Sequence, residues 1–143
     1  MNGPRDTLRK LRVVHCIDSM AVSGGSELNA VRTASALKLR GHHVSVFTLP
    51  ANLGGMSSRY ESAGIPVRRF PVGSLVGRHT MHEIKRASAE LVDGGVELVH
   101  SHDCYSNLIM VLAARIAGVP VIASKRWTQY SLRRHLYTDR LAY

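Results

Sequence analysis

The chain has 143 residues, of which 45% are hydrophobic and 20% are charged, and these proportions fit one globular domain with its own core. No apolar run approaches the roughly 20 residues that span a bilayer, and the basic N-terminus lacks the apolar core of a signal peptide, so a cytoplasmic location is expected. A formal net charge of +9 at pH 7 favours anionic partners (nucleic acid, anionic lipid or phosphorylated substrates), although a solvated basic face would give the same composition.

The first predicted unit is a strand, a glycine turn and a helix. An apolar run at 13–17 leads to Gly24 and Gly25, and the helix that follows is closed by Gly41. Its apolar side chains recur every three residues on one stripe: Leu28, Val31, Ala34 and Leu37. Paired glycines at a helix start remove the Cβ atoms that would block a ligand, and the first N–H groups of a helix attract anions. We therefore predict that a phosphate group binds at Gly24 and Gly25.

Strands and helices continue to alternate along the chain. Strands are expected at 44–48, 66–70, 96–100 and 120–123, and helices at 57–63, 81–92, 105–116 and, as a last basic segment, 131–143. The strand at 66–70 is placed at a sheet edge because it contains proline and arginines. The helix at 105–116 has the clearest amphipathic pattern, with Tyr105, Leu108, Ile109, Leu112, Ala113 and Ile116 on one face. Cys16 and Cys104 are expected to be reduced thiols.

This alternation predicts an α/β fold with a doubly wound, Rossmann-like parallel sheet in the strand order 3-2-1-4-5. Residues 1–10 form a basic N-terminal tail, and 11–143 form the domain. In this order the chain reverses direction between strands 1 and 4, where ligands bind at the carboxyl ends. The loops 19–26 and 101–104 should therefore face each other across one crevice.

Several side chains at this crevice are candidates for chemistry. His102 is the stronger of the two histidines, since His100, at a strand end, often only bonds the backbone. Asp103 is either a crevice residue or the cap of the next helix, and Glu27 either faces the crevice or complements the helix dipole. Two histidines two residues apart occur in metal sites, but without a further ligand cluster no metal is expected.

Two common phosphate-binding signatures are absent. A nicotinamide dinucleotide site needs Gly-x-Gly-x-x-Gly after strand 1 and an acidic residue at the end of strand 2, whereas this chain has Ser23-Gly24-Gly25-Ser26-Glu27 and Thr48-Leu49-Pro50. The Gly-Lys-Ser/Thr ending of a Walker loop is also missing.

Four stretches carry a resemblance to one family: 24–27 (Gly-Gly-Ser-Glu), 41–46 (Gly-His-His-Val-Ser-Val), 97–102 (Glu-Leu-Val-His-Ser-His) and 114–122 (Ala-Arg-Ile-Ala-Gly-Val-Pro-Val-Ile). In this order and spacing, from about residue 11 to 126, they resemble the N-terminal domain of family 4 glycosyltransferases. These are retaining enzymes with the two-Rossmann-domain GT-B architecture.

The resemblance implies a division of labour. Gly24 and Gly25 would approach the diphosphate of a nucleotide-sugar, and His102 matches the family histidine that faces the sugar and acceptor. No essential metal ion or other cofactor is expected. Ser23, Glu27, His100 and Asp103 are further cleft candidates. Many members have Thr-x-His-Gly where this chain has Ser124-Lys125-Arg126-Trp127, so Lys125 and Arg126 are candidates for an anionic acceptor.

The functional expectation is the N-terminal half of a retaining glycosyltransferase that transfers a sugar from a nucleotide-sugar donor to a carbohydrate or lipid-linked acceptor, as in cell-envelope polysaccharide or glycolipid synthesis. Because the family's second domain is missing, the chain alone is expected to be inactive. A non-catalytic phospho-ligand or nucleotide-binding module is the alternative. The basic C-terminal segment also permits contact with an anionic membrane. Nucleic-acid binding is disfavoured, because interleaved aromatic residues are few.

Overall fold

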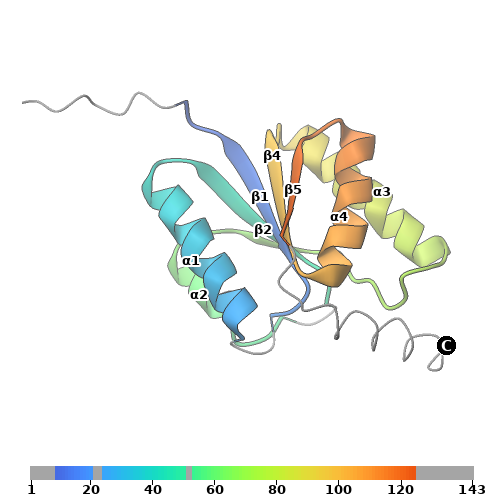
Figure 1. Cartoon of the computed structure of the whole chain (residues 1–143), viewed down its shortest axis with the longest axis horizontal. Helices are drawn as coiled ribbons and strands as arrows, with labels where there is room; N and C mark the ends of the chain where they lie inside the picture. Colours follow the sequence, from blue (N-terminus) through green and yellow to red (C-terminus); the bar gives the residue numbers. More distant parts are fainter. Residues whose placement is uncertain (1–8, 21–23, 51–52, 125–143) are drawn as a thin grey trace, which may run out of the picture.

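The computed structural model describes residues 9–20, 24–50 and 53–124 (Figure 1). Its centre is a parallel sheet of β1 (Arg12–Ile17), β2 (His43–Thr48), β3 (Val67–Arg69), β4 (Leu98–His102) and β5 (Val121–Ser124), in the order β3-β2-β1-β4-β5. Both the expected α/β class and the expected strand order are confirmed. β3 is an edge strand, as its proline and arginines predicted.

Helices cover both faces of this sheet. In Figure 1, α1 (Gly25–Leu39) and α2 (Ser57–Ser62) lie on one side, and α3 (Arg78–Asp93) and α4 (Cys104–Ala117) lie on the other. Each face has its own apolar core. Alternate residues of β1 divide between them, since Val14 and Cys16 pack toward α3 and α4 whereas Ile17 packs toward α1 and α2. The two faces thus bury successive side chains of the same strand.

Glycines end the helices where the sequence predicts. Gly41 follows α1 with a φ of 87°, and Gly118 follows α4 with a φ of 70°, both in the left-handed region that glycine adopts without strain. The His42 N–H reaches back to the Leu37 carbonyl at 3.1 Å, which satisfies a carbonyl of the last turn of α1. These stops fix where β2 and β5 begin.

Two expectations differ from the structure. β4 begins and ends two residues later than predicted, so His102, which was expected in the loop, belongs to the strand together with His100. The core face of α4 is also rotated. Leu108, Leu112 and Ile116 are about half exposed, and the buried residues are Ser106, Ile109, Met110, Ala113 and Ala114. Small side chains at the contact let α4 approach the sheet and α3 closely, and close packing outweighs the hydrophobicity of the larger residues.

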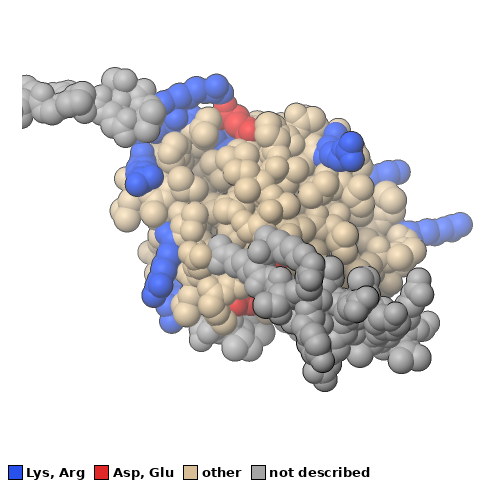
Figure 2. Space-filling model, viewed as in Figure 1, with Lys and Arg blue, Asp and Glu red and all other residues tan. Residues whose placement is uncertain are grey.

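Figure 2 shows one face, on which Lys and Arg side chains lie at the rim with uncharged surface between them. Several of these cations are paired, as Arg9 is with Glu97 and Arg86 with Glu83. The basic residues expected to meet an anionic partner, at 125–140, lie outside the described residues. Within the part of the chain that the structure describes, no helix is long and apolar enough to cross a membrane.

Candidate functional site

The start of α1 presents one open and one covered glycine. Gly24 is the N-terminal cap of the helix, and Gly25 is its first residue. A Cβ placed at Gly25 would meet no atom within 4 Å, whereas one at Gly24 would collide with Oε2 of Glu27. The Glu27 side chain therefore folds back over Gly24. A carboxylate in the first turn complements the helix dipole, and here it occupies the space beside the predicted phosphate position.

A hydrogen bond joins the start of α1 to the end of β4. Ser26 Oγ donates to Asp103 Oδ1 over 2.5 Å, between residues 77 positions apart in the sequence. Asp103 has a φ of 73°, the one positive value among the described residues other than glycine. Such a conformation is uncommon outside glycine and persists where neighbouring contacts hold it. The two loops predicted to border one crevice are thus in direct contact.

Asp103 does not cap α4 with its side chain. It occupies the cap position, but its carboxylate makes no capping hydrogen bond. The N–H groups of Tyr105 and Ser106 instead donate to the two carboxylate oxygens of Asp18, which follows β1. Burial, opposed by these two amide bonds, raises the pKa of Asp18 above its usual value. Of the two roles left open for Asp103, side-chain capping is not observed, since the carboxylate of Asp18 accepts those amides.

Three histidines meet on the sheet face that carries α1. In the strand register His15 of β1 lies beside His100 of β4, and His102 follows two residues later on the same face of β4. His15 Nδ1 and His102 Nε2 are 2.9 Å apart and share one hydrogen bond. Both side chains are fully buried. His100 is half-buried and pairs through Nε2 with Ser124 Oγ of β5 at 2.7 Å.

Burial controls the charge of His15. Desolvation, followed by the nearby His100 charge, lowers the pKa of His15 from 6.5 to about 4. His15 is therefore a neutral imidazole at neutral pH, with one nitrogen protonated and the other bare.

Among the described residues, these three histidines form the group that could hold a metal ion. Their ligand atoms lie within 4.8 Å of one another. Two nitrogens on one tetrahedral zinc ion are separated by about 3.3 Å, given Zn–N bonds of about 2.0–2.1 Å. The 2.9 Å His15–His102 contact is shorter and fits a hydrogen bond, and His100 is engaged with Ser124. In this structure, hydrogen bonds engage all three imidazoles of the cluster.

The predicted site residues fall into two groups. Gly24, Gly25, Glu27, His100, His102 and Asp103 are described, and they lie on α1 and at the carboxyl end of β4. Ser23, Lys125 and Arg126 lie outside the described residues. Sequence reasoning missed His15 and Asp18, because both stand within or next to an apolar run. The signal that would have found them is alternation, which puts His15 on the same face of the sheet as His100 and His102 once the strand order is known.

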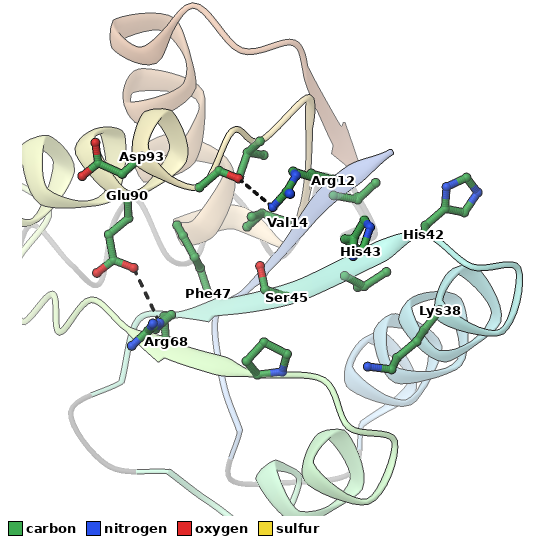
Figure 3. A pocket seen from close by; sticks show the side chains of 15 residues that line it. Arg12, Val14, Lys38, His42, His43, Ser45, Phe47, Arg68, Glu90 and Asp93 are labelled. Carbon is green, nitrogen blue, oxygen red and sulfur yellow. Dashed lines mark hydrogen bonds and ion pairs between the residues drawn. The ribbon is translucent and has the colours of Figure 1, made fainter. Parts of the chain in front are cut away.

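A hollow of about 660 Å³ lies at the opposite end of the sheet (Figure 3). It is lined by the first residues of β1 and β2 and by the end of α3. Its cations already have partners, since Arg12 donates to the Gly94 carbonyl at 3.4 Å and Arg68 lies 3.8 Å from Glu90. Lys38 donates to the Gly64 carbonyl. Ligands of open parallel sheets bind at the carboxyl ends, so this hollow is not the candidate site.

A five-stranded, doubly wound sheet, with polar residues gathered where its two central loops meet, defines a Rossmann-like domain. The chain matches the model of the glycosyl transferase 4-like domain over residues 24–141, and it belongs to that family. This match confirms the resemblance seen in the sequence. No curated protein matches the chain in sequence.

Three solved structures share this fold at low sequence identity. A glycosyltransferase from Rickettsia africae is 15% identical with a TM-score of 0.70, and the match covers 90% of this chain and 34% of that one. Anabaena HepE, solved with UDP and glucose, is 17% identical with a TM-score of 0.65, over 89% of this chain and 35% of that one. MurG from Acinetobacter baumannii is 21% identical with a TM-score of 0.64, over 86% and 39%. The chain spans little more than a third of the length of these proteins.

Proposed function

We propose that the chain is the N-terminal, acceptor-side domain of a retaining GT-B glycosyltransferase that uses a nucleotide-sugar donor. The observation that carries this proposal is the Ser26–Asp103 hydrogen bond, which unites the glycine start of α1 with the end of β4 that bears His102. Membership of the glycosyl transferase 4-like family supports the chemistry. A structure of HepE with UDP and glucose supports a nucleotide-sugar as the donor class.

In this proposal the α1 start binds the donor diphosphate. The first N–H groups of a helix have no partner within the helix, and a Cβ placed at Gly25 would meet no atom within 4 Å, which leaves space for a phosphate oxygen. As the bond to the sugar breaks, negative charge grows on the leaving diphosphate. Fixed backbone N–H groups then stabilise that charge more in the transition state than in the ground state. This contribution requires no metal ion.

His102 is the proposed sugar-facing residue, and Glu27, His100 and Asp103 are proposed to border the acceptor. His102 is buried at the end of β4 and is fixed by the bond to His15. A side chain held in one rotamer positions a substrate hydroxyl at low entropic cost. The acceptor is a carbohydrate or lipid-linked carbohydrate in this proposal. Ser23, Lys125 and Arg126 complete the proposed acceptor side, and a peripheral contact with anionic membrane would suit a lipid-linked acceptor.

The chain alone is proposed to bind donor weakly and to transfer no sugar, because the family's C-terminal domain holds most of the donor. The test is titration of the 143-residue chain, and of the full-length product of its reading frame, with UDP-sugars and other nucleotide-sugars. The longer protein is expected to bind and transfer with retention, in the presence of a metal chelator, and His102→Ala should abolish transfer.

The same titration distinguishes the glycosyltransferase from the alternative, a non-catalytic phospho-ligand or nucleotide-binding module. Binding of a nucleotide without transfer by the longer protein would identify a non-catalytic phospho-ligand module. Sugar transfer by the isolated chain would refute the proposal that the second domain is needed, and loss of transfer with chelator would refute the metal-independent mechanism.

A further inference from the structure

We propose that His15, His100 and His102 form a binding site for a transition-metal ion of the Zn²⁺ class, and that the bound ion inhibits sugar transfer by occupying His102. The proposed transfer chemistry does not involve this ion. The existence of the site depends on the geometry of the sheet alone, whereas its inhibitory effect rests on the proposed function.

The three side chains come from two neighbouring strands. His15 of β1 is the register partner of His100 of β4, and His102 lies two residues further along β4 on the same face. One ligand atom from each residue lies within 4.8 Å of the other two. The spacing of His100 and His102 in the sequence offers two ligands only, and the register of β1 against β4 supplies the third.

The spacing of the rings is close to that required by one ion. Nitrogens bound to the same tetrahedral zinc ion are about 3.3 Å apart. His15 Nδ1 and His102 Nε2 are 2.9 Å apart, so this pair has to open by only a few tenths of an ångström. The centroid of the His100 ring lies 4.0 Å from that of His102 and 5.1 Å from that of His15. Small rotations of the side chains can therefore place three nitrogens around one ion, which replaces the His15–His102 hydrogen bond, while the strands stay fixed.

The donor set favours one class of metal ion. Imidazole nitrogens suit Zn²⁺, Cu²⁺ and Ni²⁺, whereas Mg²⁺ and Ca²⁺ prefer oxygen ligands. A neutral imidazole has one bare nitrogen, so three neutral rings can supply three ligands. Three histidines on zinc leave a fourth position, which water or another small ligand occupies. The group that the described residues bring together contains imidazoles only, so neither cysteine is expected to take part.

Burial indicates how an ion reaches the site. His15 and His102 are fully buried, and His100 is half-buried. An ion therefore enters on the side of His100. The two buried rings are held by the sheet before the ion arrives, so binding orders few additional groups.

Inhibition follows from the position of His102. Coordination uses the lone pair of its ligating nitrogen and fixes the orientation of its ring beside His15. A ring held in this way cannot turn to hydrogen-bond the sugar or the acceptor. Zn²⁺ should therefore inhibit transfer, whereas Mg²⁺, which has the same charge but prefers oxygen ligands, should not.

The first test is calorimetric titration of the tag-free 143-residue chain with ZnCl₂. We expect one high-affinity ion per chain. His15→Asn and His100→Gln should each weaken binding by more than about tenfold, since loss of even an indirect support of a metal ligand costs that much. His43→Gln, which removes an exposed imidazole at the start of β2, is the matched control and should bind as wild type does. Equal affinity of wild type, His15→Asn and His100→Gln would overturn the site.

Co²⁺ provides a spectroscopic test that needs no substitution of a histidine. Co²⁺ in a four-coordinate site absorbs visible light strongly, whereas six-coordinate Co²⁺ on a protein surface absorbs weakly. We expect the strong spectrum in the wild-type chain, its loss on addition of Zn²⁺, and the same spectrum in Cys104→Ser. A weak spectrum in wild type would overturn the site even if the histidine variants do not fold. A changed spectrum in Cys104→Ser would assign the ion to the thiol and overturn it also.

Activity separates this inference from the proposed function. In the longer protein, saturating Zn²⁺ should lower transfer as far as His102→Ala does, and a chelator should restore it. Inhibition is measured against the metal-free rate of each variant, and His100→Gln should be less inhibited than wild type. Zn²⁺ also binds the donor diphosphate, so equal inhibition of wild type and His100→Gln would refute the inhibitory role, as would binding without inhibition. Full transfer by His102→Ala would instead refute the proposed role of His102 and leave the metal site intact.

Discussion

Ser26 in the first turn of α1 donates a 2.5 Å hydrogen bond to Asp103 at the end of β4. The two residues are 77 positions apart in the sequence. They come together because the strands that precede them, β1 and β4, are neighbours in the sheet. The acceptor, Asp103, has a positive φ of 73°, and the contact places the glycine start of α1 beside the strand end that carries His102. The residues whose substitution should alter ligand binding lie on both sides of this hydrogen bond, in the first turn of α1 and at the end of β4.

Gly25 is the position where a side chain would test the phosphate site most directly. A Cβ there meets no protein atom within 4 Å, and the residue is helical, so Gly25→Ala should leave stability unchanged or raise it by up to about 1 kcal/mol. The added methyl group occupies space proposed for a phosphate oxygen. Affinity for UDP should fall about tenfold, measured by calorimetry on the chain or the longer protein.

A matched glycine checks that this loss is local. Gly73→Ala also meets open space, in the loop before α3, and should keep the UDP affinity of wild type. Equal binding by wild type and Gly25→Ala would show that the diphosphate does not approach Gly25.

Glu27 is predicted to weaken donor binding in the free chain. Its carboxylate covers Gly24, so a bound phosphate must displace it or accept a negative charge a few ångströms away. Glu27→Gln removes that charge at nearly constant size, and UDP affinity should rise about three- to tenfold at low salt. The gain should shrink as salt screens the charge.

The control is Glu61→Gln on α2, an exposed carboxylate outside the crevice, which should leave the affinity unchanged. A fall in affinity for Glu27→Gln would mean that the carboxylate itself contacts the donor.

Much of this fold follows from the sequence, and the reasons are local. The strand order follows from alternating apolar runs and helical stripes, and Gly41 and Gly118 mark helix ends because each adopts positive φ. The site is harder to predict. His15 is hidden in an apolar run, and its partner His102 is 87 residues away. Only the register of β1 against β4 brings the two rings together, and register depends on packing across the whole sheet.

The exposed face of α4 shows a second limit of sequence reasoning. Leu108, Leu112 and Ile116 predict a buried stripe by their hydrophobicity, yet Ala113 and Ala114 make the close contacts. Residue size decides which side of an apolar helix can approach a neighbour, and size enters only when the neighbour is known.

Asp18 is predicted to stabilise the domain by holding the start of α4. Its two oxygens accept the N–H groups of Tyr105 and Ser106. In Asp18→Asn one oxygen becomes an NH₂ group that cannot accept, so an amide in the first helical turn loses its partner. The free energy of unfolding should fall by about 1–3 kcal/mol, measured by urea denaturation at pH 7. Asp93→Asn, at the exposed end of α3, should change it by less than about 0.5 kcal/mol. Equal stability of Asp18→Asn and wild type would contradict the capping role.

The buried His15 predicts a specific dependence of stability on pH. Its pKa is lowered from 6.5 to about 4 in the folded chain, so between these values the unfolded state binds more protons than the folded state. The sign follows: this contribution is fully present above pH 6.5 and is lost as the pH falls toward 4. From pH 7 to pH 5 the loss amounts to about 2 kcal/mol.

The variant His15→Asn tests this contribution. Its side chain at position 15 does not titrate in this range, so its free energy of unfolding should fall less over the same interval. The difference between the two proteins, from urea unfolding at each pH, isolates His15 from His100, His102 and the carboxylates. Parallel pH profiles for wild type and His15→Asn would show that the imidazole of His15 is not buried in its neutral form.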